Sequence, residues 1–319
     1  MLDILVPLDG SALAERVLPL AATLARATGG RLRLLKAISF PTVRDLIGRA
    51  DEVQSAASDY LKDQAEQAQR AYGLPAATLS QFGPASAIIV REVAGGGVRY
   101  VAMSTHARHG FSRAVLGSVA EHVLRESPVP VFLLPVAAGD KDLTAIKRML
   151  IPLDGSRLSE AVLEPAAVLA RQLGAAITLL RVDQPPEGPV STEHGVMVRS
   201  IDQEVDRMVF ETEQYMAPLV RKLQALGIQA NATEEIGCEP ASHILDLATR
   251  ADADLIVMAT HGRSGLDRLR HGSVTEQVLR HSHVPLLAFG RIPLHELVPA
   301  EAPVVEMLTG VAGSLVAGA

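Results

Sequence analysis

The sequence has few aromatic residues and little excess charge. Among its 319 residues there is no tryptophan, and there are only six phenylalanines and four tyrosines. Proteins that bind single-stranded nucleic acid by base stacking need aromatic platforms, so this composition argues against such a role. Lys and Arg total 30 against 36 Asp and Glu, and the net charge of −6 gives no general electrostatic footprint for a nucleic-acid backbone. We therefore expect no nucleic-acid partner.

The sequence also lacks the features of a disulfide-rich, secreted or membrane protein. Its single cysteine, Cys238, excludes an intramolecular disulfide framework and a multi-cysteine metal site. The amino-terminal segment MLDILVPLDGS has an acid at position 3 and no basic stretch, unlike a signal peptide. The longest uncharged apolar stretch, 307–319, has thirteen residues, whereas a membrane-spanning helix needs about twenty. We expect a cytoplasmic protein with no membrane partner.

An internal repeat divides the chain into two similar parts. The segment LVPLDGS at 5–11 recurs 145 residues later as LIPLDGS, and sixteen of the 25 positions that begin at Leu5 are identical at this shift. A second match joins 103–130 to 258–285, where sixteen of 28 positions are identical at a shift of 155. Copies of this length are typical of duplicated domains. We expect a first domain at 1–136, a linker at 136–145, a second domain at 146–290 and a tail at 291–319. The change of shift from 145 to 155 means that the second copy has a net insertion of ten residues, most of it within 184–199.

Short apolar segments alternate with amphipathic helical segments in both copies. The apolar segments are hydrophobic throughout, which is typical of strands covered on both faces. The predicted strands are 2–7, 32–38, 77–82, 100–104, 129–134, 148–153, 176–182, 228–235, 254–259 and 284–289. The first predicted helix begins after Ser11 as its N-cap, and others lie near 46–72, 85–95 and 118–126. This order predicts an α/β fold with two tandem doubly wound domains, each a five-stranded parallel sheet flanked by helices.

Both strongest repeat motifs follow a predicted strand, where such folds bind ligands. In the second copy the fourth strand leads into Ala259-Thr260-His261-Gly262, and Gly272-Ser273-Val274-Thr275-Glu276 opens a helix nine residues later. A helix N-terminus beside glycines can bind phosphate through its unpaired N–H groups. Alternatively, Ser273 with Glu276, and Ser118 with Glu121, form capping boxes that need no ligand. Both interpretations remain open at this point, and neither a Walker A motif nor a G-x-G-x-x-G motif is present.

An aspartate follows Pro-Leu at the end of the first strand in each copy. Asp9 and Asp154 are placed to accept a hydrogen bond from a ribose or a base, or else to form a strand-end turn before a helix. His106 and His261 each follow a threonine, but no nucleophile or base lies at an identifiable spacing from them. We therefore assign no catalytic residue.

At these residues the chain resembles the universal stress protein family in its tandem, two-domain form. The family signature is G-x2-G-x9-G-(S/T) between the fourth strand and fourth helix, together with a V-P-x-D start, and the resemblance covers 1–135 and 147–290. It implies a sheet of the adenine nucleotide α-hydrolase-like type, with ATP bound at the switch point in some members and not in others. It also implies that the fifth strands pack or pair between the domains, which makes an intrachain pseudo-dimer, and it allows a homodimer.

The family's nucleotide residues can be carried over position by position. In the second domain the adenine and ribose side would be Pro152, Leu153, Asp154, Val182 and Met258. The phosphate side would be Ala259, Gly262, Arg263, Gly272, Ser273, Val274 and Thr275, with Ala259 in place of the first glycine. The first domain keeps Asp9, Arg108, Gly117, Ser118 and Val119. It has Ser104 and Ala107 at the two early glycine positions, so we expect the second domain to bind nucleotide better.

The resemblance favours an ATP-binding stress-response regulator with little or slow hydrolysis and an unknown protein partner. Mg²⁺ would accompany the nucleotide because cellular ATP carries it. One alternative is a slow hydrolase that acts on ATP or on another adenylated compound, an analogy that rests on fold alone. A second alternative is a nucleotide-free scaffold for protein interaction.

Overall fold

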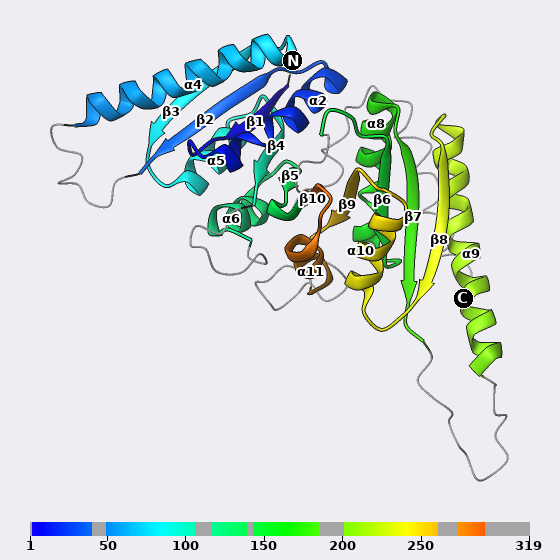
Figure 1. Ribbon diagram of the computed structural model, residues 1–319. Helices are drawn as coiled ribbons and strands as arrows, with labels where there is room; N and C mark the ends of the chain where they lie inside the picture. The colour runs from blue at the N-terminus through cyan, green and yellow to red at the C-terminus, as the bar shows by residue number, and fades with distance from the viewer. Residues whose placement is uncertain are drawn as a thin grey trace.

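The computed structural model describes residues 2–39, 49–105, 116–138, 143–185, 201–260 and 273–290. Its strands form one ten-stranded sheet (Figure 1). The strands are β1 Asp3–Pro7, β2 Leu32–Ile38, β3 Ala76–Phe82, β4 Val98–Ser104, β5 Val131–Leu134, β6 Arg148–Leu153, β7 Ala176–Asp183, β8 Ala230–Ile236, β9 Leu255–Ala259 and β10 Leu286–Phe289. Each predicted strand is present, with ends that differ by no more than two residues. β5 and β10 begin just after Pro130 and Pro285, because a proline has no N–H for the ladder.

The strand order confirms the doubly wound, parallel arrangement of each half. The order is β3-β2-β1-β4-β5-β10-β9-β6-β7-β8. All neighbours within each half are parallel, and only β5 and β10 pair antiparallel. The expected pairing of the fifth strands is thereby confirmed. The order reverses between β1 and β4 in the first half, and between β6 and β9 in the second, which defines the two switch points.

The central strand pair has local two-fold symmetry. Phe132 lies opposite Leu287, its own counterpart in the repeat, and Val131 and Leu133 lie opposite Ala288 and Leu286. The Phe132 ring is fully buried and meets the Tyr100 ring edge-on, with centroids 5.2 Å apart. The axis that relates the two halves therefore passes through a fully packed apolar contact.

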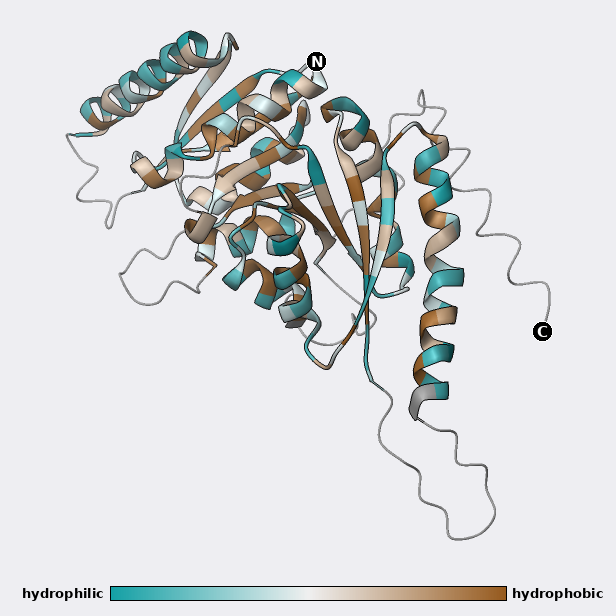
Figure 2. Cartoon of the chain, turned by 45° about the vertical axis from the view of Figure 1, so that its right-hand side comes forward, coloured by the Kyte–Doolittle hydropathy of each residue, from teal (hydrophilic) through white to brown (hydrophobic). Residues whose placement is uncertain are grey.

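Helices cover both faces of the sheet and bury two apolar cores. They are α1 Ala12–Glu15, α2 Leu18–Thr28, α4 Ala50–Tyr72, α5 Ala85–Ala94, α6 Ser118–Glu126, α7 Arg157–Glu160, α8 Leu163–Leu173, α9 Ile201–Ala225, α10 Pro240–Arg250 and α11 Ser273–His281, with a 3-10 turn η1 at Val136–Ala138. One core lies under α2, α4, α8 and α9, and the other under α5, α6, α10 and α11. Each core extends through both halves. In Figure 2 the long helix α9 shows polar and apolar residues on different sides, as a helix on a sheet requires.

Local signals explain how the first helix of each half begins. The Ser11 hydroxyl accepts a hydrogen bond from the N–H of Ala14 at 3.1 Å, which confirms this residue as an N-cap. Ser156 caps α7 in the same way through the N–H of Ser159. No helix among the described residues is long and apolar enough to cross a membrane. The tail at 291–319, and most of the segment expected to contain the insertion, lie outside the described residues.

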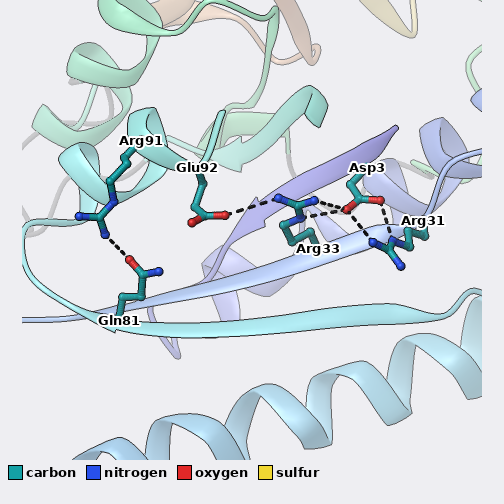
Figure 3. Close-up of polar contacts among 6 residues, drawn as sticks. All are labelled: Asp3, Arg31, Arg33, Gln81, Arg91 and Glu92. Atoms are coloured by element: carbon teal, nitrogen blue, oxygen red, sulfur yellow. Dashed lines mark hydrogen bonds and ion pairs between the residues drawn. The ribbon is translucent and has the colours of Figure 1, made fainter. Parts of the chain in front are cut away.

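A buried carboxylate joins β1 to β2 at the amino-terminal edge of the first half (Figure 3). The Asp3 side chain is 1% exposed and accepts hydrogen bonds from Arg31 Nε at 2.7 Å and Arg33 Nη2 at 2.6 Å. Arg33 also approaches Glu92 of α5 at 3.4 Å. This network lies at the edge opposite the switch point, so it contributes to stability and not to the candidate site. In the second half the charges are reversed, because Arg148 occupies the position of Asp3 and pairs with Asp252 and Asp254.

We predict that Asp3→Asn lowers the free energy of unfolding by about 1–3 kcal/mol, because it breaks a buried, charge-assisted network. Glu92→Gln should cost less than about 1 kcal/mol, because that pair is long and partly exposed. Urea denaturation of both variants measures the difference. Equal losses, or no loss for Asp3→Asn, would contradict this role of Asp3.

Candidate functional site

The predicted adenine and ribose residues gather at the carboxyl ends of β7, β6 and β9. Pairing between β6 and β9 ends at Leu150 opposite Ile256, although both strands continue for three more residues. Pro152, which has no N–H to donate, lies in the part of β6 that pairs with β7 but no longer with β9. The strands therefore part at the switch point, where a doubly wound sheet binds its ligand.

The predicted side chains do not all point to one face of the sheet. Met258 belongs to the core under α10 and α11, and Val182 packs against that core. Ile151 and Leu153 belong to the opposite core, so alternation along β6 places Pro152 on the same face as Val182. Pro152, Val182 and Met258 thus form an apolar shelf. The Leu153 side chain is buried on the other face, so only its backbone lies at the site.

Asp154 forms a turn at the end of β6. Its Oδ1 atom accepts a hydrogen bond from the N–H of Ser156 at 2.9 Å, and Asp9 Oδ1 accepts one from Ser11 at the same distance. The strand-end turn interpretation is therefore correct for both copies. Burial acts to raise the pKa of the Asp154 carboxyl, but hydrogen bonds with Ser156 and Ser159 outweigh it, and the pKa lies below its usual value. Both aspartates are exposed, so the turn does not remove their carboxylates from a ligand's reach.

The start of α6 shows how the glycine-serine motif is built. Gly117 is the N-cap, with φ −62° and ψ 146° and no side-chain cap, and Ser118 is the first helical residue. The capping-box interpretation of Ser118 and Glu121 is therefore wrong, because the serine lies one position too late. Residue 117 adopts a φ that any residue can adopt, so its glycine is not required by backbone conformation. α11 likewise begins at Ser273, which is followed by half-buried Val274. Val119 occupies the matching position in α6.

The two copies differ in how the fourth strand meets the following helix. The Thr275 hydroxyl donates a hydrogen bond to the Ala259 carbonyl at 3.1 Å and is buried. Ala120 occupies the same position in the first half. There Ser104, at the position of Ala259, is buried and donates from its hydroxyl to the Leu13 carbonyl at 2.8 Å. Each polar side chain at this junction thus bonds the protein's own backbone.

Several predicted residues lie outside the described part of the chain. They are Ala107, Arg108, Gly262, Arg263 and Gly272, together with His106 and His261. Their place in the site is known only from sequence. Among the described residues no group of three His, Cys, Asp or Glu side chains is close enough to hold a metal ion.

Sequence reasoning missed a repeated cluster beside each Asp-Gly-Ser turn. A cation on the second strand of each copy, Lys36 or Arg181, lies over a tyrosine ring of the long helix, Tyr60 or Tyr215. Burial lowers the pKa of Lys36, against the opposing effects of Asp9 and Glu15. Burial also raises the pKa of Tyr215, with Glu160 acting in the same direction. The cation and the tyrosine are present in both copies of the sequence. The cations recur at a shift of 145 and the tyrosines at a shift of 155, so no single alignment of the copies brings both pairs together.

We predict that Ser159→Ala raises the pKa of Asp154 toward its usual value, because it removes a group that favours the ionised carboxylate. A depressed pKa in the folded state stabilises the fold above the usual carboxyl pKa, and this contribution disappears as the pH falls through the folded value. The stability difference between the wild type and Ser159→Ala should therefore shrink in acid.

An NMR titration of the Asp154 carboxyl carbon measures the shift. Ser11→Ala, which removes the N-cap of the other copy, should leave the pKa of Asp154 unchanged. An Asp154 carboxyl that titrates identically in the wild type and Ser159→Ala would contradict the hydrogen-bond explanation.

Comparison with known proteins places this geometry in a family. The model of the universal stress protein family matches residues 1–135 and 145–290. Universal stress protein MJ0531 of Methanocaldococcus jannaschii is 31% identical over 142 residues, which are 44% of this chain and 80% of that protein. Universal stress protein E of Escherichia coli K12 is 26% identical over 202 residues, which are 62% of this chain and 63% of that protein.

Solved structures agree with the fold. A universal stress protein from Archaeoglobus fulgidus superposes with a TM-score of 0.68 at 23% identity, covering 91% of this chain and 98% of that one. A functionally unknown protein, PA1789 from Pseudomonas aeruginosa, gives a TM-score of 0.58 at 18% identity, covering 96% and 95% of the two chains. The family match extends over most of the sequence and occurs twice. The chain belongs to the universal stress protein family and contains two of its domains in tandem.

Proposed function

We propose that this protein is an adenine-nucleotide-binding stress-response regulator that holds ATP mainly in its second domain. The observation that supports this most directly is the start of α6, the first-domain counterpart of α11. This helix starts after a glycine and has no side-chain cap, although serine, aspartate or asparagine would cap it better. A helix start of this kind leaves first-turn N–H groups available to an anion. α11 begins at the corresponding residue of the second domain.

The apolar shelf supports an adenine base as the other end of the ligand. Pro152, Val182 and Met258 lie on the face of the sheet that α10 and α11 cover, so base and phosphate groups would meet the same side. A small number of polar groups around an apolar surface is typical of ligand sites. Asp154 would accept a hydrogen bond from a ribose hydroxyl, because its lowered pKa keeps it ionised and a carboxylate has about four acceptor positions.

On the phosphate side, the chain itself would supply backbone N–H groups and one cation. Ser273, Val274 and Thr275 form the first turn of α11, and Gly262, Arg263 and Gly272 belong to the preceding motif in the sequence. The Thr275 hydroxyl bonds the Ala259 carbonyl, so we assign its backbone N–H, and not its hydroxyl, to the phosphate. Any Mg²⁺ would arrive with the nucleotide.

The first domain is the weaker candidate for three reasons. Its shelf has Ala37 where the second domain has Val182, so it offers less apolar surface. Ser104 is buried and bonded to α1. Ala107 replaces a glycine of the signature and adds a Cβ where the backbone would approach phosphate. We therefore propose one strong site per chain.

A regulatory role fits the described residues better than fast catalysis. The carboxylate at the site, Asp154, has a lowered pKa and already accepts a hydrogen bond in a turn, which makes it a weak general base. A regulator acts by binding nucleotide more tightly in one conformation than in another, and thereby changes the surface it shows to a protein partner in the cytoplasm. A homodimer is compatible with this role. The hydrolase alternative would need the residues that lie outside the described part.

Calorimetric titration of ATP into nucleotide-stripped protein tests the proposal. We expect about one ATP per chain, and loss of binding in Gly272→Asp, because a carboxylate at the helix start repels phosphate. Asp is a favourable N-cap, so this variant should fold. Gly117→Asp, the matched change in the first domain, should leave binding nearly unchanged.

Each other outcome has a definite meaning. Two ATP per chain would show that the first domain is also a site, and no binding by folded protein would leave the scaffold alternative. Steady ATP turnover that falls in Gly272→Asp would favour the hydrolase alternative.

A further inference from the structure

We infer that Arg181 is a positioning residue for nucleotide binding: it fixes the Asp154-Gly155-Ser156 turn so that the Asp154 carboxylate faces the ligand. This inference rests on the proposed function, because it assigns a further residue to the same site. Arg181 contacts the turn, other side chains hold Arg181 in place, and the first domain repeats the arrangement.

Arg181 lies directly against the turn. Gly155 has a φ of +75°, a conformation that favours glycine, and a Cβ placed on it would be 2.6 Å from Arg181 Nη1. Glycine is therefore needed here for its backbone conformation, and a side chain in its place would also have to move the guanidinium. Since any side chain at residue 155 would displace Arg181, the turn and the arginine fit each other.

The guanidinium is itself held in place. Arg181 Nε donates to Asp183 Oδ1 at 2.8 Å, and the Thr212 hydroxyl donates to Asp183 Oδ2 at 2.6 Å. On another side the Tyr215 ring lies 5.5 Å from Arg181 Cζ, within the range of a cation–π contact. The Arg181 side chain is 24% exposed. A planar group fixed by these partners is a rigid support and not a mobile surface charge.

The first domain contains the same arrangement with a different cation. Lys36 Nζ donates to the Asp9 carbonyl at 2.7 Å, and a Cβ on Gly10, whose φ is +93°, would lie 3.0 Å from that nitrogen. Lys36 Nζ also lies 4.7 Å from the centre of the Tyr60 ring, and the Tyr60 hydroxyl donates to Glu15 Oε1. Both copies thus place a cation between the turn and a tyrosine, whether the cation is lysine or arginine.

Arg181 acts through the turn and not by touching the base. Leu179 belongs to the core under α8 and α9, so alternation along β7 places Arg181 on that face. Val182 faces the opposite side, with the apolar shelf. Asp183 pairs with the charge of Arg181. We therefore assign the effect of Arg181 on the ligand to its contact with the turn.

Titration of ATP into the full chain tests this role. Arg181→Ala should weaken binding about fivefold to tenfold, and Arg181→Lys should restore affinity to within about twofold of the wild type, since lysine holds the turn in the first domain. Arg250→Ala, which removes a surface arginine of the same domain paired with Glu235, should have no effect. In an Asp154→Asn background, Arg181→Ala should cause no further loss, because residues that act together are not additive.

Hydrogen exchange at the Ser156 amide, which bonds Asp154 Oδ1, gives a readout without nucleotide. Exchange there should be faster in Arg181→Ala, while the amide of Ile151 in β6 stays protected. Failure of the wild type to bind ATP would overturn the proposed function alone. Hydrogen exchange at the Ser156 amide would then decide whether Arg181 holds the turn. Unchanged exchange at Ser156, or losses that add in the double variant, would overturn the positioning role.

Discussion

The antiparallel pairing of β5 with β10 is the contact on which the arrangement of the whole molecule depends. It joins two parallel half-sheets into one and relates them by a two-fold axis through Phe132 and Leu287. The carboxyl ends of the strands consequently point in opposite directions in the two halves, so the two switch points lie at opposite edges of the sheet. Each core continues across the central pair, and the two domains share their apolar interior.

Within the second domain, three local features converge on one edge of the sheet. The β6–β9 ladder stops early beside Pro152, the apolar shelf faces α10 and α11, and the Asp154 turn rests on Arg181. Each has an independent structural reason to exist. A proline has no N–H to donate to a neighbouring strand, β7 and β9 need apolar residues toward their helices, and a strand-end turn needs glycine. Their coincidence at a switch point, together with the helix start after a glycine, supports the proposed nucleotide site.

Much of this was accessible from the sequence, because the signals were local and occurred twice. Apolar segments located the ten strands, and the identity between the copies implied duplicated domains. The pairing of their fifth strands followed from the family resemblance. One local detail was misassigned. The helix lies at 118–126 as predicted, but its N-cap is Gly117 and not Ser118, so the capping box is absent. The contact of Arg181 with Gly155 and Tyr215 joins a strand, a turn and a helix that are far apart in the chain, so no local pattern indicated it.

The location of the nucleotide is the central claim, and photolabelling with 8-azido-ATP tests it most directly. Mass spectrometry of the digested, labelled chain would identify the modified peptides. The account predicts labelling within 149–183 or 255–260, around the second switch point, that unlabelled ATP prevents. Labelling that is confined to the first domain, or that ATP does not prevent, would contradict it.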